Sequence, residues 1–317
     1  MQDQDFAPKR SLKDYLKLFF CGAVMGAADI VPGVSGGTMA FILGIYNELL
    51  NAIKKILSPD SVKLVCRFQI KKIFTELPWL FLAVLGSGIL CAILLFSHPI
   101  QWMLEKRLAL ILAFFFGLII GSAITVFPKV AKWSFSRFLA LAAGAAGGFW
   151  VVGLPMLASP PEGKWYLILC GAVAICAMIL PGISGSFMLL LMGKYKYILS
   201  AVNEIKKGVD LAGNFLSLCL FCCGTVIGIS LFVRLLSWLL KKYNDITVAV
   251  LIGFMLGSLR KVWPWKVDSL ITNDNILPVI DKSFCLALLL TVAGLVLVLV
   301  IEYIARRMQP GAEGSEC

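Results

Sequence analysis

One short motif occurs twice in this chain, each time inside a long apolar stretch. Residues 31–37 (VPGVSGG) return as residues 180–186 (LPGISGS). A proline ends or kinks a helix. Lipid cannot satisfy the backbone groups freed there, so such a break is tolerated only where it faces protein or a polar cavity. Two breaks at corresponding positions of two halves are typical of the substrate site of a membrane transporter.

The repetition extends well beyond the motif. Aligned without a gap, residues 21–53 and 170–202 are identical at 15 of 33 positions, and residues 88–128 and 224–264 are identical at 13 of 41. The offset between the halves shrinks from the first alignment to the second because the first half has the longer basic linker, residues 54–76. The chain is therefore predicted to be a duplicated unit.

The composition places the chain among membrane proteins. Of its 317 residues, 60% are hydrophobic and 15% are charged, and the mean hydropathy is +0.90, far from the averages of soluble domains. The net charge of +11 comes from Lys and Arg in short loops beside apolar spans. There they orient the protein and meet anionic lipid, so nucleic acid is not an expected partner. No cleavage site follows the basic segment Met1–Lys17, so we expect that segment to stay in the cytoplasm of a bacterial inner-membrane protein.

Each half is predicted to hold one broken segment and three transmembrane helices. Leu18–Val31 is 14 residues long, about 21 Å as a helix, which is short of the hydrocarbon thickness of about 30 Å. A re-entrant helical hairpin fits this length. With three crossings per half, the two halves run antiparallel, as in the inverted repeats of alternating-access carriers. The predicted segments are 1–17 (cytoplasmic), 18–157 (first repeat, with hairpin 18–53 and spans 78–97, 108–127 and 136–157), 166–304 (second repeat, with hairpin 166–202 and spans 214–240, 246–263 and 283–304) and 305–317 (cytoplasmic tail).

The distribution of basic residues bears on this topology. With the N-terminus inside and each hairpin returning to its own side, most of the 29 Lys and Arg residues lie inside, as the positive-inside rule requires. An arrangement in which the broken segments cross and the N-terminus lies outside satisfies the rule equally well, so the count leaves both open. The basic cluster before the first helix favours the cytoplasmic N-terminus.

The helix that follows each break is predicted to begin with unpaired backbone N–H groups and a serine hydroxyl. Such a helix start binds anions such as phosphate, because its donors and the positive end of the helix dipole face the ligand. The alternative is structural: serine as an N-cap and glycine for close helix packing. Arg234 takes the repeat position of His98, and a snorkelling arginine is the competing interpretation. The predicted phosphate-binding residues are Ser35, Gly36, Gly37, Thr38, Ser184, Gly185, Ser186 and Arg234.

Asp29 is an acid at membrane depth in one half only, since its repeat partner is Met178. Ionisable residues within the membrane are expensive and are functional hypotheses by default. We predict that Asp29 couples transport to a proton or acts as a counter-charge. The alternative is that Asp29 caps the local backbone break.

Enzyme and metal chemistry are the weaker readings. Residues 33–37 match the G-x-S-x-G pattern of serine nucleophiles, but such a serine needs a base within hydrogen-bond reach. His98 is the single histidine and stands at the end of a span. Three closely spaced cysteines, Cys219, Cys222 and Cys223, lie in an apolar stretch without histidine or carboxylate neighbours. A zinc site needs four N or S ligands. We therefore expect neither an enzyme nor a metal or other cofactor.

Three segments together carry a family resemblance: residues 26–38, 180–186 and 253–260 (GFMLGSLR). They resemble the bacterial polyprenyl-phosphate translocase family (PopT), formerly a membrane domain of unknown function, and the likeness covers roughly residues 15–305. The resemblance implies that undecaprenyl phosphate, or a related polyprenyl phosphate, is flipped from the outer to the inner leaflet by alternating access. A carrier of small soluble anions and an intramembrane enzyme acting on lipid phosphates or peptides remain as alternatives. The sequence leaves a homodimer open, and membrane lipids are the other expected partners.

Overall fold

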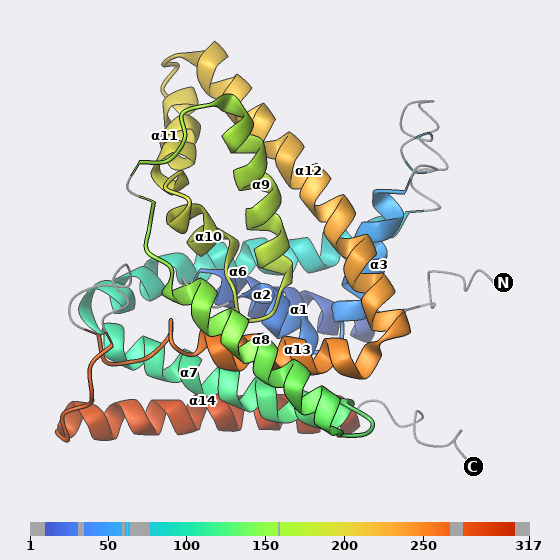
Figure 1. Cartoon of the computed structure of the whole chain (residues 1–317), viewed down its shortest axis with the longest axis vertical. Coiled ribbons are helices and arrows are strands. Elements are labelled where there is room, and N and C mark those ends of the chain that lie inside the picture. Colours follow the sequence, from blue (N-terminus) through green and yellow to red (C-terminus); the bar gives the residue numbers. More distant parts are fainter. Residues whose placement is uncertain are drawn as a thin grey trace.

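The computed structural model of the chain describes residues 10–30, 35–58, 61, 63, 77–157, 159–266 and 275–307. Among these residues the regular structure is helical, which confirms the expected all-α membrane protein (Figure 1). The residues of the first motif before Ser35, the linker cysteine Cys66 and the C-terminal Cys317 lie outside the described part. The helices are α1 (Leu12–Asp29), α2 (Gly36–Ile42), α3 (Tyr46–Ile56), α6 (Trp79–Lys106), α7 (Leu108–Val126), the short 3-10 helix η1 (Phe127–Lys129), α8 (Phe135–Gly153), α9 (Lys164–Ile179), α10 (Gly185–Leu191), α11 (Tyr195–Lys206), α12 (Leu211–Lys242), α13 (Asn244–Ser258) and α14 (Lys282–Arg307).

Each broken segment forms three helices rather than two. We call α1 to α3 the first hairpin and α9 to α11 the second hairpin. The single helix expected after each motif is wrong, because it divides at Gly44 in the first half and at Gly193 in the second. These glycines are partners in the repeat alignment and adopt positive φ angles of 73° and 68°, a conformation that costs glycine little.

Within the described residues, five helices are long and apolar enough to cross a membrane: α6, α7 with η1, α8, α12 and α14. The remaining predicted span, 246–263, overlaps α13, whose 15 residues extend only about 22 Å. The first predicted span, 78–97, is the beginning of a longer helix, since α6 continues through Pro99 to Lys106. The antiparallel relation of the halves stays a prediction.

Glycines at matched positions bring the same helix pairs together in both halves. Gly22 of α1 lies against the backbone of α6, and Gly88 of α6 lies against the backbone of α1. Gly171 and Gly224 do the same for α9 and α12. None of the four sites has room for a Cβ atom, so the helix backbones approach closely, as small residues allow in membranes.

The third long helix of each half packs on the other half. Gly117 of α7 lies against α14, and Gly253 of α13 lies against α8. In Figure 1, α7 and α14 run together along the lower edge, and α8 and α13 lie beside them. This exchange interlocks the two halves through two close helix pairs, α7 with α14 and α8 with α13.

The ends of the two hairpins are placed differently. α11 packs on α12 of its own half, where the hydroxyls of Tyr197 and Ser217 are hydrogen-bonded at 2.9 Å. α3 packs on α12 too, although α12 belongs to the other half. The hairpins thus share α12 as a partner helix. The two halves are therefore alike in their glycine contacts but differ in the packing of α3 and α11.

Candidate substrate site

The two motifs lie against each other in the structure. The hydroxyl of Ser35 donates a hydrogen bond to the carbonyl of Met178 at 2.9 Å. In return, the backbone N–H of Gly182 donates to Oγ1 of Thr38 at 2.8 Å. In Figure 1 the loop between α9 and α10 reaches down to α2 and α13. The first hairpin and the second hairpin therefore meet at one place, which sequence spacing alone could not show.

A third hydrogen bond joins the hairpins, from the hydroxyl of Tyr46 to the carbonyl of Ile179 at 3.1 Å. Tyr46 begins α3, and its repeat partner is Tyr195. Its ring meets Phe41 edge to face at a centroid distance of 5.0 Å. Tyr46 is buried and thus fixes the start of α3 to the end of α9.

The start of α2 has its N–H groups satisfied within the protein. The N–H of Gly36 donates to Oδ1 of Asp29 at 2.6 Å, and that of Gly37 donates to Oγ of Ser35 at 3.1 Å. The N–H of Thr38 donates to the carbonyl of Ser35 at 2.9 Å. The expectation of unpaired donors here is wrong, because Asp29 and Ser35 cap the helix.

The start of α10 differs from that of α2. The hydroxyl of Ser184 does not cap the helix and instead lies 2.8 Å from that of Ser186. Within the described part of the chain, no acceptor is found for the backbone N–H groups of Gly185 and Ser186. Both residues are partly exposed, whereas Ser35 and Thr38 are buried. The second motif is thus the one whose donors are accessible in this conformation.

Lys261 reaches the start of α10 from the turn after α13. Its side chain is buried, with 1% exposed, and Nζ lies 4.4 Å from the ring centroid of Phe187. The sequence analysis places the Lys and Arg residues of short loops at anionic lipid, and the burial of Lys261 corrects that expectation for this residue. The available signal was the repeat alignment, which pairs Lys261 with Thr125 and so marks a charge present in one half only.

Arg234 is not brought to the two motifs. It is exposed on α12, and Nη2 donates to the carbonyl of Leu57 at 3.3 Å. Leu57 caps the C-terminal end of α3, a helix of about 16 Å, whereas Tyr46 at its other end lies by the site. His98, its repeat partner, is exposed on α6.

An open, mostly apolar cavity borders the site. We call this cavity of about 280 Å³ the hairpin cavity; Asp29, Gly36, Gly37 and Tyr46 line one part of it, and aliphatic side chains of α1, α3, α6, α9 and α12 line the rest. The side chain of Met178 also lines it and is 44% exposed. The site is therefore accessible from outside the protein through this cavity.

The geometry does not support a serine nucleophile or a metal centre. Ser35 donates to a backbone carbonyl, and the partner of Ser184 is another serine hydroxyl. Across the described residues, no three His, Cys, Asp or Glu side chains gather as metal ligands would. The residues at the site are hydrogen-bond donors, one carboxylate and one buried lysine.

Long apolar helices and two interlocked helix breaks beside an open cavity define a polytopic membrane transporter. The family described as VCA0040-like, undecaprenyl phosphate translocase-like, matches residues 25–277. The chain belongs to this family, which confirms the resemblance seen in its motifs.

Two relatives carry the name polyprenyl-phosphate transporter. That of Vibrio cholerae serotype O1 is 43% identical over 253 residues, which are 80% of this chain and 79% of the relative. That of Staphylococcus aureus is 31% identical over 256 residues, 77% of this chain and 84% of the relative. No solved structure matches the chain. The relatives are transporters, as expected for a protein that is not an enzyme.

Proposed function

We propose that this protein moves undecaprenyl phosphate, or a related polyprenyl phosphate, across the bacterial cytoplasmic membrane from the outer to the inner leaflet. The observation that carries the proposal is the joining of the two motifs beside a cavity that is polar at one part and aliphatic elsewhere. A lipid phosphate needs both a set of donors and an apolar surface. Family membership and the names of the relatives support the same substrate class.

The phosphate would first be held by the second motif. Ser184 and Ser186 supply hydroxyls, and the N–H groups of Gly185 and Ser186 have no acceptor within the described residues. Gly185 lies close to the Cβ position of Met178, whose side chain lines the hairpin cavity. Lys261, buried next to Phe187 at this helix start, would supply the positive charge.

The first motif would take part after Asp29 withdraws. The Asp29 carboxylate accepts the Gly36 N–H and so stands where a phosphate oxygen would stand. A carboxylate and a phosphate at the same helix start would repel each other, because both are negatively charged. A proton taken up by Asp29 would weaken this hydrogen bond and free the N–H of Gly36 for the phosphate, which links proton uptake to phosphate binding. Arg234 would remain a cap for α3.

A small soluble anion is the second candidate cargo. A polar cavity of about 230 Å³ lies beside Tyr46, and Asn47, Lys129 and Asn244 line it. Such a cavity suits a small hydrophilic ion. The lipid is favoured because the cavity that contacts both hairpins has mainly aliphatic walls.

The test is transport by the purified full chain in liposomes. Labelled undecaprenyl phosphate is placed in both leaflets, and the fraction open to an added phosphatase is followed over time. We expect the protein to make the undecaprenyl phosphate of the inner leaflet accessible to the phosphatase. Added undecaprenol, which lacks the phosphate, should not slow this transport. Uptake of inorganic phosphate with no effect on the lipid would overturn the proposal in favour of the soluble anion.

A further inference from the structure

We propose that the hairpin cavity binds the isoprene units next to the phosphate, so that the tail lies between the two halves and not on the outer surface of the first hairpin. This inference rests on the proposed function. It assigns a specific place in the protein to the hydrocarbon tail of the proposed substrate.

The walls of the hairpin cavity suit a branched hydrocarbon chain. They include Leu82, Leu85 and Ile89 of α6, Ile175 of α9 and Ile229 of α12. Burial of such a chain against aliphatic side chains is favourable in proportion to the area removed from water. The volume of about 280 Å³ holds the first part of a long polyprenyl tail, and the remainder would extend into the bilayer.

The hairpin cavity combines a few polar residues with many apolar ones, as a polyprenyl phosphate combines one polar group with an apolar chain. Asp29 and the backbone of Gly36 and Gly37 form its polar part, and the hydroxyl of Tyr46 lies there as well. Aliphatic side chains line the rest of the same cavity. A polyprenyl phosphate whose phosphate contacts the motifs would therefore place its first isoprene units against these walls.

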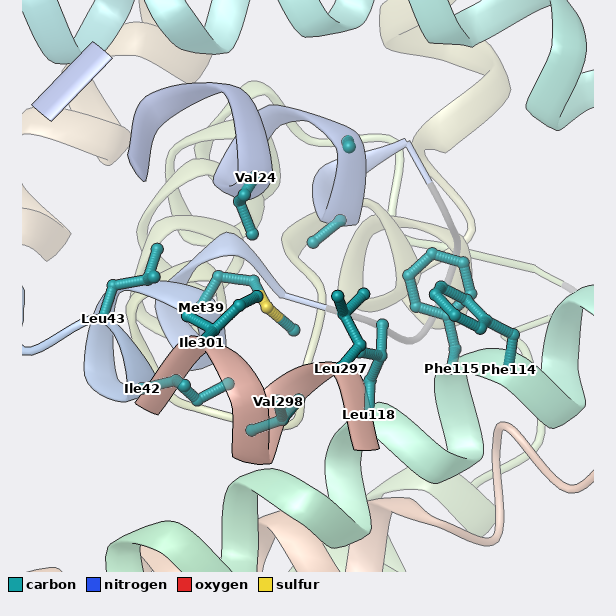
Figure 2. A pocket seen from close by; sticks show the side chains of 12 residues that line it. Val24, Met39, Ile42, Leu43, Phe114, Phe115, Leu118, Leu297, Val298 and Ile301 are labelled. Atoms are coloured by element: carbon teal, nitrogen blue, oxygen red, sulfur yellow. The ribbon is translucent and has the colours of Figure 1, made fainter. Parts of the chain in front are cut away.

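A second cavity provides the comparison. It has a volume of about 190 Å³ and lies on the opposite face of α1 and α2. Figure 2 shows its labelled side chains, which come from α1, α2, α7 and α14 and from Leu43 at the C-terminal end of α2. Val24, Met39, Leu118 and Leu297 are typical of them, and none of the described residues that line this cavity has a polar side chain. A tail could enter this cavity, but its phosphate would find no donor among those side chains.

Both halves contribute walls to the hairpin cavity. α6 belongs to the first half, and α9 and α12 belong to the second. A chain held there would be released or rearranged whenever the halves move relative to each other. Tail binding at this place therefore connects the lipid to an alternating-access movement.

Gly86 allows a direct test, because it lines the cavity, is exposed, and has no atom within 4 Å of an added Cβ. Gly86→Leu narrows the cavity without a clash at Cβ and also raises helix propensity. The matched control is Ser87→Leu, at the next position of α6, which is exposed and does not line the cavity. Both variants keep every residue of the two motifs.

The measurements are lipid transport in liposomes and photolabelling with a diazirine analogue of farnesyl phosphate. We expect Gly86→Leu to lower transport at least tenfold and Ser87→Leu to behave as the unmodified protein. We expect the label on α6, α9 or α12 residues of the hairpin cavity. Normal transport by Gly86→Leu, equal loss in Ser87→Leu, or a label on α7 and α14 would each overturn the inference. A protein that moves no polyprenyl phosphate at all would instead refute the proposed function.

Discussion

Replacement of Asp29 separates its structural contribution from its proposed role in coupling. In the structure its carboxylate accepts the N–H of Gly36 at 2.6 Å, at the positive end of α2. A hydrogen bond to a charged group contributes about 1.5–3 kcal/mol, and one between neutral groups about 0.5–1.5 kcal/mol. We therefore expect Asp29→Ala to lower the free energy of unfolding by about 2 kcal/mol. Asp29→Asn, which keeps an acceptor oxygen, should lower it by about 1 kcal/mol.

The functional expectation for Asp29→Asn follows from its amide, which cannot take up a proton. The variant should fold and bind the lipid, but its transport rate should no longer vary with an imposed pH gradient. Unfolding in detergent with a denaturant gives the free energies, and flux in liposomes at several external pH values gives the coupling. An Asp29→Ala variant as stable as the unmodified protein would refute the cap. A pH response unchanged in Asp29→Asn would reduce Asp29 to that cap.

Four further expectations concern packing, the second motif, the buried charge and topology. Gly22→Leu should lower the free energy of unfolding by about 1–3 kcal/mol, because the larger side chain overpacks α1 against α6. Denaturant unfolding measures this change, and an unchanged free energy would contradict the close approach of the two helix backbones. Ser184→Ala should weaken lipid-phosphate binding by about 1 kcal/mol, the value of one hydrogen bond, and a binding titration with undecaprenyl phosphate would detect it. Lys261→Met should weaken the same binding about tenfold or more, since bonds to charged groups contribute about 1.5–3 kcal/mol, and should leave undecaprenol binding unchanged. Cys66 and Cys317 should both react from the cytoplasmic side with an impermeant thiol reagent when the other cysteines are removed; reaction from opposite sides would contradict the re-entrant hairpins.

The sequence predicted the helical breaks well because their causes are local. Proline and glycine interrupt an apolar helix wherever they stand, and a membrane leaves helices as the available form for the rest. The division at Gly44 and Gly193 was missed because a single glycine within a helical pattern is also compatible with a continuous helix. Only the positive φ of both residues shows the break.

The two motifs could be found in the sequence, but the contact between them could not. The repeated motif identified Ser35 and Ser184, but the bond from Ser35 to Met178 joins residues 143 positions apart. No local pattern fixes such a contact. Arg234 was selected by repeat position alone, and the packing of α3 on α12 gives it the carbonyl of Leu57 instead.

By itself, the sequence determined that this is a duplicated, helical membrane protein with two broken segments and a family resemblance to lipid-phosphate translocases. These properties depend on residue type and spacing along the chain. The tertiary structure alone decided that the two motifs interlock, that Asp29 occupies the start of α2, and that Lys261 is buried beside Phe187. Each of these depends on which helices pack together, and that is set by the close backbone contacts of glycines in distant parts of the chain.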